Sequence, residues 1–176
     1  MATGFGRTGH RFVADLVLPD ILVLGKALTG GYIGHAVTVA NEKVFRAFYD
    51  DNDRHALMHG PTFMGNALAC AAALKSIELF QREDYMSKIA RIEEISRREL
   101  LGFSDPRIKD VRVMGGCACI EVYDGTVLDG YQQFAYERGV FSRPFLNYCY
   151  SMVPYVIQEA ELVKIFDTMK EWFRRG

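Results

Sequence analysis

A lysine that follows the end of an apolar run is the most constraining feature of this sequence. The run covers residues 21–24 and is bounded by Pro19 and Gly25, a pattern typical of a short buried β-strand. Lys26 follows directly, and a glycine pair comes soon after it, at 30–31. Because open α/β folds bind ligands at the carboxyl edge of the sheet, this pattern predicts an amine delivered to a ligand site.

The chemistry available to Lys26 depends on its surroundings. In a mostly apolar site, desolvation disfavours the ammonium form and lowers the pKa of a lysine. The resulting neutral amine is the form that reacts with an aldehyde to give a Schiff base. The alternative is an ordinary solvated lysine. The residues around Lys26 therefore make it a candidate catalytic group.

A glycine motif near the start of the chain matches a well-known fingerprint by its letters only. Gly4-Phe-Gly6-Arg-Thr-Gly9 has the form G-x-G-x-x-G. The dinucleotide-binding fingerprint also requires a strand before the first glycine and a helix after the last. Three residues precede Gly4, and the residues from His10 onward are expected to form a strand. We therefore predict no dinucleotide site here.

Two further segments carry candidate binding residues. The loop from His59 to Asn66 contains Gly60, Pro61 and Thr62, and precedes an alanine-rich segment with high helix propensity. Backbone amides, a threonine hydroxyl and a helix N-terminus can together cradle a phosphate group, although a capped helix after an ordinary loop fits equally well.

The second segment is Arg143-Pro144-Phe145, which follows an apolar pair. An arginine held beside a rigid proline can present its guanidinium to a carboxylate through two hydrogen bonds. Aromatic residues follow, among them Tyr150, and they could form the wall of a pocket or simply pack on a sheet.

Composition excludes several classes of protein. The 21 basic and 22 acidic residues give a net charge of −1, which argues against a dedicated nucleic-acid binder. The four cysteines form no C-x-x-C pair and no zinc-ligand spacing with the histidines, so no metal site is predicted. No apolar run approaches the roughly 20 residues of a membrane span, and no signal peptide is recognised. We expect a cytoplasmic protein.

The pattern along the chain is mixed α/β. Strands are expected at 20–25, 36–40, 111–114, 118–122, 140–142 and 151–157. Helices are expected at 42–49, 67–82, 84–101, 127–138 and 159–174, with Asn41 and Asn66 as N-caps of the first two. The change of character after Gly102 predicts a domain boundary there.

In this order, the segments Gly4–Gly9, Pro19–Gly31, His59–Asn66 and Arg143–Phe145 resemble the C-terminal part of a class III pyridoxal-phosphate aminotransferase. The resemblance covers essentially the whole chain. It implies a fold-type I α/β transferase, with residues 1–102 as the end of the large cofactor domain and 103–176 as an α+β small domain.

The resemblance also implies roles for single residues. Lys26 would form the Schiff base with pyridoxal 5'-phosphate and shuttle the proton, and Pro61 and Thr62 would bind the cofactor phosphate across a homodimer interface. Three residues would bind substrate: Gly60, Arg143 through a carboxylate, and Tyr150.

Within the class, the loop at 59–66 is similar to that of members that move an amino group from S-adenosylmethionine to 8-amino-7-oxononanoate in biotin biosynthesis. The family aspartate that pairs with the pyridine nitrogen lies before the glycine motif and is not in this sequence, so we expect a truncated form with poor activity. An aminotransferase for an ω-amino acid, or an inactive dimerising or cofactor-binding remnant, are the alternatives.

Overall fold

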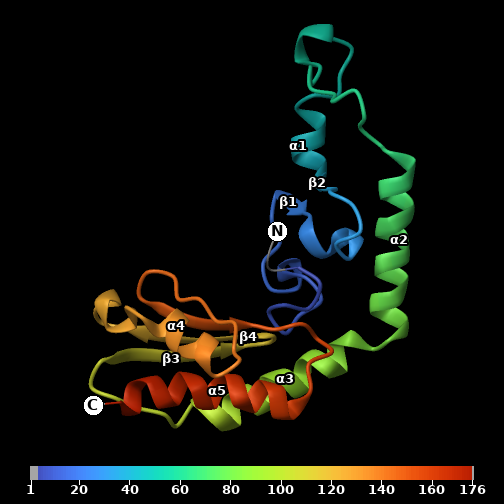
Figure 1. Ribbon diagram of the computed structural model, residues 1–176. Helices are drawn as coiled ribbons and strands as arrows, with labels where there is room; N and C mark the ends of the chain where they lie inside the picture. Colours follow the sequence, from blue (N-terminus) through green and yellow to red (C-terminus); the bar gives the residue numbers. More distant parts are fainter. Residues whose placement is uncertain (1–3, 176) are drawn as a thin grey trace. The chain divides into compact units, whose positions relative to one another are not determined.

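The structure is a computed structural model that describes residues 4–175, and its helices and strands are labelled in Figure 1. These residues divide into two units. The first unit contains residues 4–5 and 10–84, and the second contains residues 6–9 and 85–175. Helix α3 (Tyr85–Leu100) clusters with the second unit. The boundary that the sequence predicted near residue 102 separates two domains of a longer enzyme, and it stays a prediction.

The first unit is built on a two-stranded antiparallel ribbon and two helices. Strand β1 (Ile21–Leu24) pairs with β2 (Val37–Ala40), and α1 (Glu42–Arg46) and α2 (Ala67–Arg82) follow. The two expected caps are confirmed: the Asn41 side chain accepts from the amide of the third residue of α1, and Asn66 does the same for α2. Helix α1 is shorter than the expected segment 42–49.

The expectation that β1 is buried is wrong for the described residues. Ile21 is 54% exposed and Val23 is 42% exposed, because β1 pairs with β2 alone in this unit and one of its faces is uncovered. The buried core of the unit is small, with Phe5, Leu28 and Ala73 at its centre.

The second unit contains a three-stranded antiparallel sheet. Strand β4 (Cys117–Val122) lies between β3 (Ile108–Met114) and β5 (Tyr148–Met152). The β3–β4 hairpin turns at Gly115 and Gly116, between the strands that the sequence predicted at 111–114 and 118–122.

The other two strands expected in this part of the chain are corrected. Residues 140–142 form no strand, because the Val140 amide bonds back to the carbonyl of Ala135 at the end of a helix. The strand expected at 151–157 lies earlier, at 148–152. Pro154 lacks the amide hydrogen that a ladder needs, so the strand ends before it.

Three helices cover one face of this sheet. They are α3, α4 (Tyr131–Glu137) and α5 (Glu159–Arg174), whose apolar faces share one core with the strands. Helix α5 has the bounds that the sequence predicted. The single helix expected at 127–138 is instead a 3-10 helix followed by α4, because Gly130 has a left-handed φ of 85° that interrupts the helix.

A charged cluster lies on the strands β3 and β4. Glu121 accepts hydrogen bonds from Lys109 Nζ at 2.7 Å and from Arg112 Nη1 at 2.6 Å. These two hydrogen bonds, that of Lys109 first, hold the pKa of the Glu121 carboxyl below its ordinary value of 4.5. The charged form of Glu121 is therefore favoured by folding.

This cluster predicts a pH-dependent contribution to stability. Because folding lowers the pKa of Glu121, its contribution is present above pH 4.5 and is lost as the pH falls further, through the pKa of the folded state. We expect Glu121→Gln to be less stable than the wild type at pH 7, and we expect this difference to shrink as the pH falls below 4.5. Urea unfolding curves at pH 7, 5, 4 and 3 measure it, and a difference that stays constant down to pH 3 would contradict the prediction.

Candidate active site

Lys26 lies at the exit of β1, on a strained turn. Its φ is 51°, in the left-handed region that residues with a side chain rarely adopt, and a 3-10 helix (Lys26–Thr29) starts at this residue. Strain of this kind costs of order 1–3 kcal/mol and concentrates at functional sites. The position of the lysine agrees with the prediction from sequence.

The turn that carries Lys26 is anchored on α2. The Ser76 hydroxyl donates to the Ala27 carbonyl at 3.2 Å, and Leu28 belongs to the core of the first unit. The buried Thr29 donates its hydroxyl to the carbonyl of Ile33 at 2.5 Å. These contacts hold the backbone of the turn in place, so the lysine side chain extends from a rigid base.

The apolar surroundings expected for Lys26 are not found among the described residues. Its side chain is exposed, because β1 and β2 form the whole sheet of this unit and no described element covers the lysine. Residues 4–175 therefore do not provide the apolar site that the sequence predicted around Lys26.

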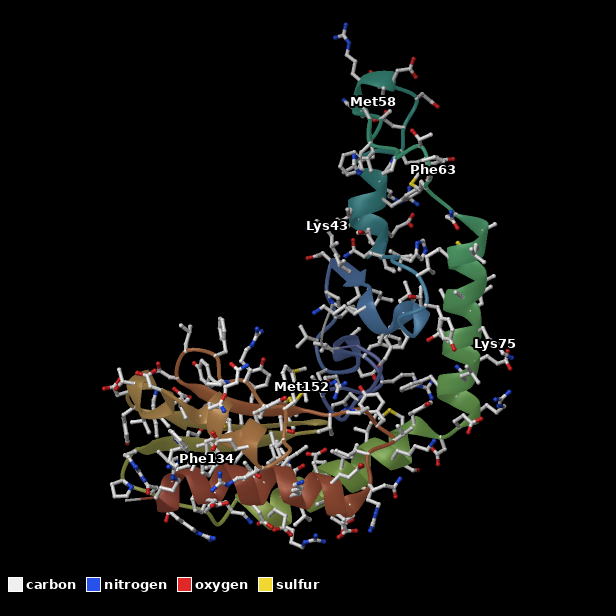
Figure 2. The ribbon with its side chains drawn as sticks, viewed as in Figure 1. Lys43, Met58, Phe63, Lys75, Phe134 and Met152 are labelled. Carbon is white, nitrogen blue, oxygen red and sulfur yellow. The ribbon has the colours of Figure 1, made fainter. Side chains whose placement is uncertain are left out.

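The loop with Gly60, Pro61 and Thr62 is exposed and lies in the first unit, directly before α2. Figure 1 shows this loop beyond the end of α1 and away from the β1–β2 ribbon, and Figure 2 labels Met58 and Phe63 beside it. Within one chain, the structure therefore does not bring this loop together with Lys26.

The second unit holds a cavity of about 460 Å³ that brings Arg143 and Tyr150 together. Its other lining residues come from the segment before Arg143, from the end of β5 and the loop after it, and from α5: Phe141, Ser142, Ser151, Met152, Val153, Pro154, Ile157 and Ile165. The sequence pattern predicted the arginine and the tyrosine as site residues, but not the two serines. A lone serine has no sequence signal, since only the fold reveals where its hydroxyl lies.

The glycine motif near the start of the chain is divided between the units, with Phe5 in the core of the first and residues 6–9 packed within the second. Residues 6–9 form a turn on the β3–β4 hairpin, where the amide of Gly116 donates to the Arg7 carbonyl at 3.0 Å. The Arg7 guanidinium donates to the Val153 carbonyl at 2.8 Å and lies over the Tyr155 ring. The strand expected after His10 is absent, and a 3-10 helix follows at 13–15.

The residues present are chemically suited to pyridoxal phosphate. Lys26 provides an exposed primary amine on a strained turn, and Thr62 provides a hydroxyl in a loop of backbone amides before a helix. Among the described residues no cluster of three histidine, cysteine or carboxylate side chains that could hold a metal occurs, and none of their helices is long and apolar enough to cross a bilayer.

Comparison with known proteins places the chain in a family. The model of the class-III aminotransferase family matches residues 1–173, so the chain belongs to this family.

Among individual proteins, the chain is 42% identical over 177 residues to adenosylmethionine-8-amino-7-oxononanoate aminotransferase of Mycobacterium leprae, covering 97% of this chain and 40% of that protein. The chain spans about 40% of the length of the curated relatives it matches.

Solved structures share the fold. A crystal structure of adenosylmethionine-8-amino-7-oxononanoate aminotransferase from Methanocaldococcus jannaschii is 31% identical with a TM-score of 0.85, covering 98% of this chain and 44% of that one. A thermostable ω-transaminase mutant from Pseudomonas jessenii is 27% identical with a TM-score of 0.86, covering 97% and 41%. The fold is therefore that of class III transaminases, an α/β fold, as the sequence predicted.

Proposed function

We propose that this chain is part of a pyridoxal-phosphate aminotransferase that moves the amino group of S-adenosylmethionine to 8-amino-7-oxononanoate, a step of biotin biosynthesis. The observation that carries the proposal is the strained turn of Lys26, in a chain with relatives at 42% and 31% identity that are named after this reaction. Homodimer formation and a cytoplasmic location are part of the proposal.

Each candidate residue of the chain has a part in this function. Pyridoxal phosphate, when bound, supplies an aldehyde that captures amino groups and a ring that accepts electrons. Lys26 holds that aldehyde through Nζ and then moves a proton at the reacting carbon. The Thr62 hydroxyl and the amides near Pro61 bind the phosphate, and Arg143 binds the substrate carboxylate, with Gly60 and Tyr150 beside the substrate.

A second copy of the chain completes the site in this proposal. The loop that contains Pro61 and Thr62 lies away from the turn of Lys26 within the first unit (Figure 2). It also exposes large apolar side chains, Leu57, Met58, Phe63 and Met64. Exposed apolar patches of this kind mark protein interaction sites, which supports a loop that reaches the lysine of the partner.

Trapping with borohydride tests the proposal. The purified chain is mixed with pyridoxal phosphate, reduced with borohydride and digested, and we expect mass spectrometry to find the pyridoxyl group on Lys26. Lys26→Ala should carry no adduct. Lys43→Ala, which removes another exposed lysine of the same unit, should be modified like the wild type.

The amino donor distinguishes the proposed reaction from the alternatives. S-adenosylmethionine added before borohydride should lower the yield of adduct, because amino transfer consumes the aldehyde. If β-alanine lowers the yield of adduct and S-adenosylmethionine does not, the result would instead indicate an ω-amino acid transaminase. The similarity to the Pseudomonas jessenii protein favours this candidate. An adduct that no donor lowers would indicate a remnant that binds the cofactor without activity, and a wild type without adduct would contradict the cofactor assignment.

A further inference from the structure

A row of three sulfur-containing side chains crosses the sheet of the second unit. Cys117, the first residue of β4, lies directly opposite Met114 of β3 and directly opposite Met152 of β5. Directly opposite residues of antiparallel strands point to the same face of the sheet, with Cβ atoms about 4.5–5.5 Å apart. In this sulfur row, one thiol therefore has a thioether on each side.

The sulfur row lies on the face of the sheet that the helices leave uncovered. Ala118 and Ser151, which neighbour the row in sequence, are buried, so the alternation along each strand turns the row outward. Met114 is 54% exposed, Met152 is 46% exposed and labelled in Figure 2, and Cys117 is half-buried. Because methionine side chains are flexible, both thioethers can turn toward the thiol between them.

A fixed positive charge lies beside Cys117. The Arg7 guanidinium donates to the carbonyl of Gly116 at 3.3 Å and to that of Val153 at 2.8 Å, so it is held next to the residue before Cys117. Burial raises the pKa of the Cys117 thiol, and the charge of Arg7 opposes this rise. A metal ion that binds a thiol displaces its proton, so the sulfur need not be ionised beforehand.

The donor atoms of the sulfur row select a soft metal ion. Thiolate and thioether sulfur suit Cu(I), whereas zinc sites are built from thiolate, imidazole and carboxylate ligands. The four histidines of the chain all lie between residues 10 and 59, in the first unit. We propose that Met114, Cys117 and Met152 bind one Cu(I) ion through their three sulfur atoms, the Cys117 proton passing to solvent as the copper–sulfur bond forms. The proposed function gives these residues no role, so the inference goes beyond it.

Cys119 provides a matched comparison for Cys117. It lies two residues further along β4, on the same face, and is half-buried like Cys117. The residues directly opposite it are Arg112 and Tyr150, which offer no sulfur. The same strand therefore presents one thiol between two thioethers and one thiol without them.

Competition with the chromophoric Cu(I) chelator bicinchoninate tests the inference. The full chain is added without oxygen to the copper complex of the chelator, and we expect it to withdraw one Cu(I) ion. Cys117→Ser should weaken this binding by at least about 100-fold, because loss of groups that only support metal ligands already costs about 10- to 100-fold. Met114→Leu and Met152→Leu should each weaken it about tenfold, since leucine keeps the volume and offers no sulfur.

Two control variants leave the sulfur row intact. Cys119→Ser removes the comparison thiol, and Met86→Leu removes a half-buried methionine of α3 in the same unit. Both should bind Cu(I) like the wild type. X-ray absorption by the copper-loaded chain should show sulfur as the only neighbour of the metal, with fewer sulfur atoms in Met152→Leu. Nitrogen or oxygen neighbours in place of sulfur would contradict the site.

The outcomes decide the inference independently of folding and of the proposed function. Equal losses of affinity in Cys117→Ser and Cys119→Ser would overturn it, because any thiol would then serve. A wild type that takes no copper from the chelator, or methionine variants that bind like the wild type, would overturn it as well. The methionine variants remain a test if Cys117→Ser does not fold. Trapping on Lys26 is a separate measurement and should succeed in folded Cys117→Ser, so the proposed function and this inference can fail separately.

Discussion

Replacing Gly115 with alanine is expected to lower the free energy of unfolding of the second unit by at least about 3 kcal/mol. A Cβ at this position would lie 2.1 Å from the Gly9 amide nitrogen and 2.6 Å from the Thr8 carbonyl carbon. Both are backbone atoms, so neither moves without disturbing the turn at 6–9. The φ of Gly115 is 55°, which adds strain for any residue with a side chain.

Urea unfolding followed by tryptophan fluorescence measures the effect of Gly115→Ala. The chain has a single tryptophan, Trp172, which packs against Phe134 in the core of the second unit. Gly102→Ala is the matched control, because a Cβ at Gly102 meets nothing within 4 Å. Its stability should lie within about 0.5 kcal/mol of the wild type. Equal stability of the two variants would show that the turn does not pack on the hairpin as described.

The second large effect is expected in the core of the same unit. Phe166 on α5 is fully buried among side chains of the sheet and the other helices. Phe166→Ala should lower the free energy of unfolding by about 3–5 kcal/mol, because it removes apolar contacts and leaves a cavity that the surrounding core fills only in part. The same fluorescence assay measures it.

Phe145→Ala provides the comparison for Phe166→Ala. Phe145 lies in the same unit but is 60% exposed, and its contact with Tyr148 runs through the backbone, which alanine retains. We expect its cost to stay below about 1 kcal/mol. A loss as large as that of Phe166→Ala would contradict the arrangement of core and surface in this unit.

Features specified by neighbouring residues could be predicted from the sequence. Asn41 and Asn66 cap their helices, and α2 and α5 have the expected bounds, because capping and helical periodicity act over three or four residues. Lys26 was identified for the same reason, since the apolar run, the lysine and the glycines are contiguous. The strained φ of Lys26 became visible only in three dimensions.

Features that depend on distant partners could not be predicted in this way. Tyr148 begins a strand because β4 pairs with it, and Val140 does not because its amide bonds to the helix before it. The apolar composition of β1 predicted burial, yet burial requires a covering element, and the described residues supply none. The division of the expected helix at 127–138 arises from the left-handed Gly130.

For the candidate site, the sequence by itself indicated the family, which the family comparison confirms, and it made Lys26 and Arg143 candidate site residues, which stay predictions. Such residues lie in motifs of contiguous residues, so the residue types and their spacing can be recognised without the fold. Only the tertiary structure decided that Ser142 and Ser151 share a cavity with Arg143, and that Gly115 lies against Gly9. Such contacts join residues far apart in the chain. They are stabilised by packing and hydrogen bonding between those residues, which a local sequence pattern does not predict.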